Sequence, residues 1–439
     1  MRRILYGFFW ILIFLFLTLS PIIVMMIGAV RPGRGFWTEF SVSLGFLGLA
    51  MMGLQFLLTA RYQGITSPYG IDVVYHFHRQ ISFVILALVL AHPLILFITR
   101  PNTIEYLNVF TASWAARFGI FGLLCMAFVV FASVYRKRIR ISYEPWRMSH
   151  AIVAILAIVF TRAHLVSVGY YADTTVKQVI WVGGHGALWI GALTYIRVIK
   201  PMMMLRRPYK VKEVRPERGN VYSLVLKPDG HKGMEFKPGQ FAWLTIWNSP
   251  FALKEHPFSF SSSALNEGQI EFAIKELGDF TSQVKNIKPG TTAYLDGPFG
   301  DLTIDNHPAP GYVFLVGGIG ISPIMSILRT MKDRRDMRPL VLIFGSKTWD
   351  ELTFREEIDI LKDSLNLKVV YILEDPPEDW EGEKGFVTPD LLARHLPENR
   401  VEIRYFICGP EPMINAVEYG LVKLGISLEQ THSERFNLV

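Results

Sequence analysis

The sequence predicts a multi-domain fold: a six-helix transmembrane bundle, then an antiparallel β-barrel, then an α/β domain. Three observations along the 439 residues predict it. Six long apolar runs fill residues 1–205, short alternating stretches between Gly and Pro turns fill 206–305, and apolar strands alternate with helices in 306–439. The change of composition near residue 205 indicates a change of solvent from lipid to water, so we expect these three ranges to be the domains.

The predicted membrane spans lie near residues 4–28, 38–60, 76–99, 113–134, 147–168 and 177–199. Each run is long enough to cross a hydrocarbon core of about 30 Å. The first run is too long for the apolar part of a signal peptide, and no A-x-A cleavage pattern follows it. We therefore expect it to be a membrane helix.

Basic residues set the expected orientation. The loop Arg136–Arg140 and residues 197–212 after the sixth span are rich in Lys and Arg, which favours the cytoplasmic side. An even number of spans then puts both termini in the cytoplasm, in a multi-pass protein of the inner (plasma) membrane. Arg31 and Arg34, in the first outer loop, count against this orientation. Residues 197–212 are equally typical of a lipid-headgroup contact and of a stop-transfer flank.

The charge and the cysteine count exclude two classes of function. The net charge of +7 does not indicate nucleic acid, because the excess lies beside the apolar runs. Cys125 and Cys408 are the only cysteines, too few for a four-cysteine zinc site or iron–sulfur cluster.

Four histidines in the third and fifth spans repeat one spacing. His78 and His92 are 14 residues apart, as are His150 and His164. Fourteen steps return to within about 40° of one helix face and rise roughly 21 Å, so each helix offers two imidazoles on one face. Because both spans run outward, we expect His78 to face His150 on the inner side and His92 to face His164 on the outer side. Two bis-imidazole sites in a membrane indicate two b-type haems, ligated for electron transfer.

Other ionisable residues lie beside these four. Arg79 and Arg147, near the inner ligands, are interpreted as propionate partners or as headgroup contacts. Arg162, two residues before an outer histidine, is a candidate acceptor-side residue that pairs a propionate or attracts an anionic or oxygen-type acceptor. His185 has no partner at the same spacing and is interpreted as a packing, propionate or proton-path residue. His76 is left unassigned.

Two motifs in the barrel region are typical of a flavin site. The first, His256-Pro257-Phe258-Ser259, lies on a predicted strand, where Phe258 would cover a flavin ring and Ser259 would bond its N5 edge. In the second, Gly278 and Thr281 begin a predicted helix, and free N–H groups at a helix start hold pyrophosphate.

A glycine loop follows the first strand of the α/β region, at Val316–Pro323. The strand–turn–helix pattern, with Pro323 near the helix start, is typical of a dinucleotide site. Only glycine lets the backbone approach a phosphate this closely, and Cys408-Gly409-Pro410 after a later strand strengthens the interpretation.

The order of these motifs along the chain resembles that of a known family. Residues 210–439 resemble the ferredoxin–NADP reductase superfamily, residues 1–200 resemble the ferric reductase transmembrane domain, and the combination resembles bacterial ferric reductases and NADPH oxidases. The resemblance implies FAD at the barrel motifs, that is, at His256, Pro257, Phe258, Ser259, Gly278 and Thr281. It implies NAD(P)H at the α/β motifs, that is, at Gly317, Gly318, Gly320, Pro323, Cys408, Gly409 and Pro410.

Three positions carry finer implications of the resemblance. His256 stands where soluble members usually have Arg. Phe436 would cover the flavin, although three residues follow it and core packing explains it as well. Lys347, with help from Arg355, would favour a 2′-phosphate and hence NADPH over NADH; a solvated surface lysine is an equally good account.

The resemblance also implies a function. Cytoplasmic NAD(P)H would reduce FAD, and electrons would pass through two haems to a small extracytoplasmic acceptor. Dioxygen giving superoxide and ferric iron giving ferrous iron both stay open, as does delivery to a partner redox protein, which is not required. A proton channel or transporter with a histidine relay is the alternative from another class, and the paired spacing and flavin motifs argue against it.

Overall fold

The computed structural model describes residues 2–26, 33–62, 69–252, 254–266, 268–400 and 402–435. The chain forms two compact units, Met1–Lys200 and Pro201–Val439. The first unit is helical and the second contains two six-stranded sheets. The predicted fold class is confirmed.

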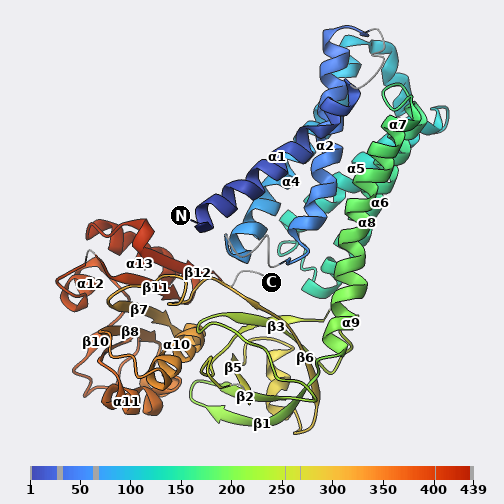
Figure 1. Ribbon diagram of the computed structural model, residues 1–439. Helices are drawn as coiled ribbons and strands as arrows, with labels where there is room; N and C mark the ends of the chain where they lie inside the picture. The colour runs from blue at the N-terminus through green and yellow to red at the C-terminus, as the bar shows by residue number, and fades with distance from the viewer. Residues whose placement is uncertain are drawn as a thin grey trace. The chain divides into compact units, whose positions relative to one another are not determined.

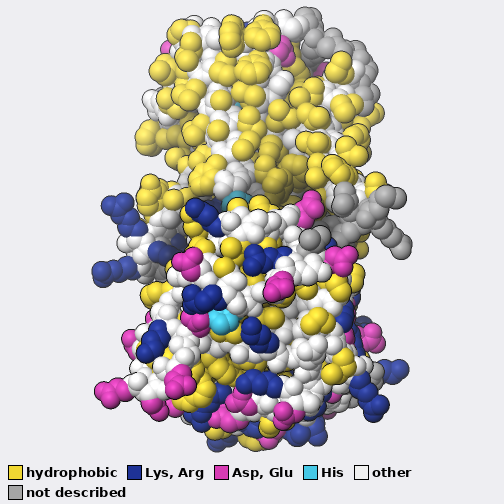
Figure 2. Space-filling model, turned by 90° about the vertical axis from the view of Figure 1, so that its left-hand side faces the viewer, with side chains coloured by type: hydrophobic (Ala, Val, Ile, Leu, Met, Phe, Trp, Pro, Cys, Tyr) yellow, Lys and Arg dark blue, Asp and Glu magenta, His cyan; other side chains and the backbone are white. Residues whose placement is uncertain are grey.

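Among the described residues, six helices are long and apolar enough to cross a membrane (Figure 1). They are α1 (Arg2–Met25), α2 (Phe36–Leu58), α4 (Ile71–Thr99), α5 (Trp114–Tyr135), α6 (Tyr143–Val168) and a composite helix over Thr175–Leu205. A short 3₁₀ helix, η1 (Pro101–Leu107), follows α4. Hydrophobic side chains cover the visible face of this unit, whereas charged side chains are spread over the second unit (Figure 2). This is the surface expected of a helix bundle surrounded by lipid.

The sixth span is not a regular α-helix. It consists of α7 (Thr175–Gln178), α8 (His185–Thr194) and α9 (Lys200–Leu205), joined by the π-helical turns η2 (Val179–Gly184) and η3 (Tyr195–Ile199). A π-turn changes the pairing of backbone carbonyls, and such turns are frequent at functional sites. In η2 the carbonyl of Trp181 accepts a hydrogen bond of 3.0 Å from Arg162 Nη1 on α6.

An apolar cluster lies at the centre of the helical unit. Ile85 on α4 is fully buried, and Ala157 and Ile158 on α6 are each 1% exposed. Ile85 lies midway along the chain between His78 and His92, and Ala157 lies midway between His150 and His164. The cluster therefore fills the space between the two levels of histidines.

The first sheet of the second unit is antiparallel, in the order β4-β3-β6-β1-β2-β5. Its strands are β1 (Tyr209–Glu217), β2 (Val221–Pro228), β3 (Phe241–Ile246), β4 (His256–Ser259), β5 (Ile270–Lys275) and β6 (Thr292–Phe299). A bridge between Phe260 and Phe272 and a hydrogen bond from Ser261 N to the Glu271 carbonyl join the two edge strands. The sheet closes into a barrel, and the strands predicted at 221–226, 241–246 and 269–275 lie in it.

The second sheet is parallel throughout, in the order β10-β9-β8-β7-β11-β12. Its strands are β7 (Tyr312–Gly317), β8 (Leu340–Ser346), β9 (Leu367–Leu373), β10 (Glu383–Lys384), β11 (Arg404–Cys408) and β12 (Thr431–Glu434). Helices α10 (Ile321–Asp333) and α11 (Arg355–Ser364) cover one face, and α12 (Pro389–His395) and α13 (Glu411–Lys423) cover the other (Figure 1). Both faces are buried, which is why these strands read as continuous apolar runs.

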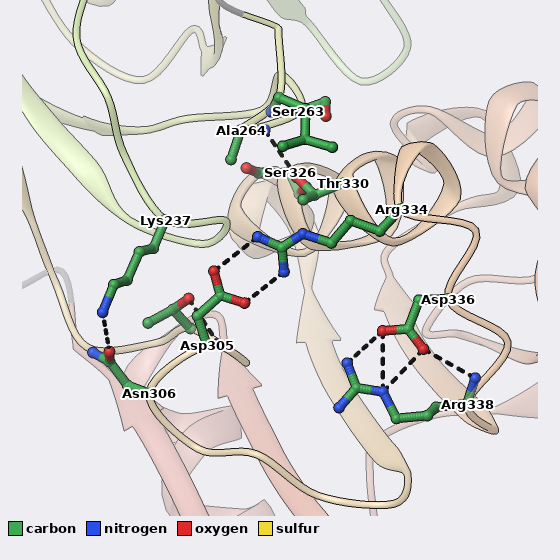
Figure 3. A network of polar contacts seen from close by, with 12 residues as sticks. Lys237, Ser263, Ala264, Asp305, Asn306, Ser326, Thr330, Arg334, Asp336 and Arg338 are labelled. Atoms are coloured by element: carbon green, nitrogen blue, oxygen red, sulfur yellow. Dashed lines mark hydrogen bonds and ion pairs between the residues drawn. The ribbon is translucent and has the colours of Figure 1, made fainter.

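Polar contacts join the barrel to the α/β sheet within this unit (Figure 3). Arg334, at the end of α10, forms a bidentate ion pair with Asp305, at 2.6 and 2.9 Å. Thr330 Oγ1 accepts a hydrogen bond of 2.9 Å from the backbone N–H of Ala264 in the barrel. Arg329, the residue before Thr330, reaches Glu271 of the barrel at 2.7 Å and Glu357 of α11 at 2.6 Å. The two sheets are therefore held together by α10.

Candidate functional site

The four histidines of the membrane unit form two facing pairs. The ring centroids of His78 on α4 and His150 on α6 are 6.4 Å apart, and those of His92 and His164, on the same two helices, are also 6.4 Å apart. Two imidazoles that bind one metal ion from opposite sides, each about 2 Å from it, have ring centres roughly 6 Å apart. The spacing of both pairs therefore fits a metal between the rings.

His92 and His164, named the outer pair after the predicted orientation, are oriented by backbone carbonyls. His92 Nδ1 lies 2.9 Å from the carbonyl of Ser41 on α2, and His164 Nδ1 lies 2.7 Å from the carbonyl of Ala115 on α5. A carbonyl only accepts, so in both rings Nδ1 carries the proton and donates it. This leaves the lone pair of Nε2 for a metal, the arrangement found at histidine ligands generally.

The inner pair is oriented differently. Ser133 Oγ on α5 donates to the Val129 carbonyl at 2.6 Å, so it accepts from His150 Nδ1 at 3.1 Å. His78 Nδ1 is buried and has no hydrogen-bond partner within the described part of the chain. The inner pair is thus oriented by a hydrogen bond to one neighbouring helix, α5. The outer pair is oriented by hydrogen bonds to two, α2 and α5.

Two glycines make room for the outer rings. A Cβ atom at Gly45 on α2 would lie 3.3 Å from His92 Cγ, and one at Gly119 on α5 would lie 3.0 Å from His164 Nδ1. The backbones of α2 and α5 therefore lie directly against the two outer imidazoles. The sequence prediction missed Ser41, Gly45 and Gly119, because only the tertiary structure brings them beside the histidines.

Arg162 on α6 and His185 on the sixth span both contact Trp181. Besides bonding the Trp181 carbonyl, the guanidinium lies 3.6 Å from the position of a Cβ atom at Gly186. Trp181 stacks on His185 with ring centroids 4.6 Å apart, and His185 Nε2 lies 3.3 Å from Ser20 Oγ on α1.

The remaining ionisable residues beside the histidines lie nearer the surface. Arg79 and His76 are exposed on α4, and Arg147 is half-buried on α6. Their predicted roles stay predictions.

The flavin motif lies on β4, where alternate residues point to opposite sides. His256 and Phe258 share one side, and Phe280 lies across both, with ring centroids 3.9 and 6.0 Å away. Ser259 is buried, and its carbonyl accepts a hydrogen bond of 3.2 Å from Ser322 Oγ at the start of α10. Phe280 was missed by the sequence prediction, although it immediately precedes Thr281.

The predicted pyrophosphate helix is a six-residue 3₁₀ helix, η4 (Thr281–Asn286), rather than an α-helix. Thr281 Oγ1 accepts hydrogen bonds of 2.9 Å from the N–H groups of Leu277 and Gly278. The Thr281 hydroxyl thus stabilises the turn that precedes the helix, through hydrogen bonds within the motif itself.

The glycine loop has the predicted strand–turn–helix form. β7 ends at Gly317, Gly318–Gly320 form a 3₁₀ turn with Gly318 at a φ of +53°, and α10 begins at Ile321 with Pro323 in its first turn. A Cβ atom at Gly320 would lie 2.2 Å from the Cys408 carbonyl oxygen, so only glycine permits this approach. The two predicted motifs, the loop and Cys408-Gly409-Pro410, therefore lie against each other.

A carboxylate missed by the sequence prediction lies beside this junction. Glu434 on β12 is adjacent in register to Cys408 on β11, and both are buried, at 5% and 1% exposure. Burial, followed by the charge of Glu434, raises the pKa of the Cys408 thiol above its ordinary value. The thiol is therefore neutral at physiological pH. Phe436, two residues further on, lies outside the described residues.

The two residues predicted to select the nicotinamide coenzyme differ in exposure. The ammonium of Lys347 is exposed, but it lies 4.0 Å from the exposed carboxylate of Asp375. The guanidinium of Arg355 is 13% exposed, donates to the Trp349 carbonyl at 3.0 Å and stacks over the Trp349 ring at 4.2 Å. Lys347 is thus the more exposed of the two, and the predicted role of both stays a prediction.

Three family models match the chain in succession. The ferric reductase like transmembrane component matches residues 44–161, an FAD-binding domain matches 207–301, and the oxidoreductase NAD-binding domain matches 314–419. The chain has the architecture of the ferric reductase and NADPH oxidase-like flavocytochromes. The chain thus combines a ferric reductase like transmembrane component with FAD- and NAD-binding domains, and its described residues include helices long and apolar enough to cross a membrane.

Two curated reductases match part of the chain. The reductase component of propane 2-monooxygenase from Mycolicibacterium smegmatis is 32% identical over 218 residues, 47% of this chain and 61% of the relative. NADH-cytochrome b5 reductase 1 from Debaryomyces hansenii is 32% identical over 163 residues, 36% of this chain and 57% of the relative. The chain thus spans about 60% of the length of these relatives.

One solved structure adds evidence on the fold alone. The flavohemoglobin from Malassezia yamatoensis with bound FAD and heme is 17% identical, with a TM-score of 0.50 over 92% of this chain and 100% of the flavohemoglobin.

Proposed function

We propose that the chain transfers electrons from cytoplasmic NADH or NADPH, through FAD and two b-type haems, to an acceptor on the far side of the inner (plasma) membrane. Dioxygen, reduced to superoxide, and ferric iron, reduced to ferrous iron, are the candidate acceptors. Flavin accepts a hydride and releases single electrons, and haem carries one electron at a time. The basic segments at Arg136–Arg140 and 197–212 support an orientation with both termini in the cytoplasm.

The observation that carries the proposal is the pair of 6.4 Å imidazole spacings at two levels of the same two helices. In three of the four histidines, Nδ1 donates to a neighbouring carbonyl or hydroxyl. This leaves Nε2 of each ring to bind iron. Held by two imidazoles, each iron would transfer electrons rather than bind small molecules. The proton-channel alternative needs a hydrogen-bonded chain between the pairs, where instead Ile85 and Ala157 are packed.

In this proposal the second unit, Pro201–Val439, supplies the electrons. The glycine loop at Gly320, the proposed dinucleotide site, lies against Cys408 of β11. Phe258 and Ser259 lie on the barrel strand β4. Ser322 connects the two, since it begins α10 and bonds the Ser259 carbonyl. We propose that these residues bring a nicotinamide and a flavin ring together, with the buried Cys408 and Glu434 beside the nicotinamide.

The proposal is tested by spectroscopy of haem in the purified full chain. NADH or NADPH added without oxygen should produce the absorption bands of reduced b-type haem, equivalent to two haems per chain. His78→Ala and His92→Ala should each remove one haem, whereas His76→Ala, an exposed histidine on the same helix, should retain both. Two haems retained in both ligand variants would exclude the ligand assignment. Dioxygen and a ferric chelate, added in turn to the reduced protein, then rank the two candidate acceptors.

A further inference from the structure

A small cavity lies at the end of the helical unit that the proposed orientation places outside. It has a volume of about 180 Å³. Its lining comes from the end of α1, the start of α2 and the connection from α6 into the sixth span: Ile22, Met25, Met26, Glu39, Tyr170, Tyr171 and Lys177. A protein cavity of about 150 Å³ holds benzene. The cavity is therefore large enough for one substituted ring.

The polar groups of the cavity form an ordered set. The hydroxyl of Tyr171 donates to Glu39 Oε2, and the backbone N–H of Arg34 donates to Glu39 Oε1 at 2.9 Å. The guanidinium of Arg34 lies over the rings of Tyr170 and Tyr171, at 4.2 and 5.0 Å. Burial, together with the hydrogen bond to Glu39, raises the pKa of Tyr171 to about 12, so its hydroxyl stays protonated.

Lys177 is a buried cation in the lining of the cavity. The side chain of Lys177 is 5% exposed, and its ammonium lies 3.3 Å from the carboxylate of Asp173. An ammonium has three donors and one ion pair uses only part of this capacity. One side of the cavity thus offers the N–H donors of Lys177, beside the Tyr171 hydroxyl that donates to Glu39, and the other side offers the thioethers and aliphatic carbons of Met25, Met26 and Ile22.

The side chains that line the cavity disfavour iron as its occupant. Within the ranges that the structure describes, no group of three or more His, Cys, Asp or Glu side chains is placed to hold a metal ion. Each carboxylate near the cavity already has a cation beside it, Arg34 for Glu39 and Lys177 for Asp173. Both carboxylates are therefore already engaged by a cation rather than by a metal ion, and a bulky ferric chelate exceeds the volume.

The cavity also lies close to the outer histidine pair. Glu39 precedes by two residues Ser41, whose carbonyl accepts from His92. The ring of Tyr171 contacts Phe46 edge to face, with centroids 6.2 Å apart, and Phe46 follows Gly45, which lies against the His92 ring. An occupant of the cavity is therefore within a helical turn of the groups that orient the outer imidazole.

We propose that this cavity binds a quinone, an uncharged ring with oxygen acceptors, as the electron acceptor of the outer haem. The inference rests on the proposed electron path. NAD(P)H gives two electrons and releases one proton in the cytoplasm; one quinone takes up these two electrons, singly, and two protons from the outer aqueous phase to form a quinol. No bond to the protein forms. Glu39 and Tyr171 are the positioning residues through which the protons reach the quinone oxygens.

The experiment follows oxidation of the haems in the full-length protein. The haems are reduced with a stoichiometric amount of NADH without oxygen and are then mixed with tetramethyl-1,4-benzoquinone. The oxidation rate should saturate with quinone concentration. Tyr171→Phe and Glu39→Gln should each lower the saturating rate or raise the half-saturating concentration at least tenfold. Tyr106→Phe and Glu105→Gln, exposed neighbours in η1 outside the cavity, should match the unsubstituted chain.

Three outcomes separate the inference from the function on which it rests. Equal quinone kinetics in Tyr171→Phe and Tyr106→Phe overturn the cavity assignment while NADH still reduces the haems. Equal slowing of oxidation by quinone, dioxygen and ferric citrate in Tyr171→Phe places the effect on the haem and also overturns it. Haems that neither NADH nor NADPH reduces overturn the proposed function itself.

Discussion

Replacement of Gly119 by alanine tests whether the outer histidine pair holds a haem. The added Cβ lies 3.0 Å from His164 Nδ1, closer than such atoms normally approach, so the ring must shift by a few tenths of an ångström. The shift lengthens the 2.7 Å hydrogen bond to the Ala115 carbonyl, which orients the ring. Overpacking of a tight site costs about 1–3 kcal/mol. Haem affinity at the outer site should therefore fall by roughly five- to 150-fold, since 1.4 kcal/mol is about a factor of ten.

Gly53→Ala is the matched control, because a Cβ atom at Gly53 on α2 meets nothing within 4 Å. Alanine favours a helix over glycine by about 1 kcal/mol, so both variants receive the same gain in helix stability. Haem content and the reduction potentials of both haems are measured by redox titration. Gly119→Ala should lose or shift the outer haem only, and Gly53→Ala should keep both. Two unchanged haems in Gly119→Ala would refute the reasoning.

Three further changes test other parts of the molecule. Ser133→Ala removes the acceptor of the inner ring's Nδ1–H and should weaken binding of the inner haem by about 10- to 100-fold, measured by haem titration of the apoprotein. Burial opposes ionisation of Glu271, but ion pairs led by Arg329 outweigh it and lower its pKa. Ionised Glu271 therefore stabilises the fold above the ordinary pKa of about 4.3, and this contribution is lost as the pH falls through the lower folded pKa. In melting curves, Glu271→Gln should be less stable than the unsubstituted chain at pH 7, and the difference should shrink toward pH 3; a constant difference would contradict the assignment. Asp375→Asn removes the carboxylate 4.0 Å from Lys347, and because exposed pairs are worth about 0.2–1 kcal/mol, kcat/KM for NADPH relative to NADH should rise roughly 1.4- to fivefold.

The sequence predicted the parts of the fold that depend on periodicity. Long apolar runs become membrane helices, and Tyr312–Val316 becomes a buried parallel strand, because burial on both faces requires continuous apolar residues. The histidine pairs follow from the same logic, since a 14-residue spacing fixes both face and depth on a helix. Helix ends are less predictable, and several begin or end a few residues from their expected positions.

The contacts that orient the site residues could not be predicted in this way. Ala115 orients His164 through a backbone carbonyl, which every residue type offers. Asp375 meets Lys347 only because β8 and β9 pair in one particular register. Thr281 begins a 3₁₀ helix rather than an α-helix, because its hydroxyl bonds the preceding turn. Such local hydrogen bonds compete with regular helix geometry.

The apolar cluster around Ile85 and Ala157 has a consequence for energy coupling. It separates the two levels of histidines with buried hydrocarbon, a layer of low dielectric constant. An electron that passes from the inner pair to the outer pair moves its charge through this layer, so in the proposed orientation the transfer is electrogenic. A charge that crosses a whole membrane gains or loses about 2.3 kcal/mol per 100 mV. A membrane potential that is negative inside would therefore draw electrons outward, and turnover in sealed vesicles should slow when that potential is reversed.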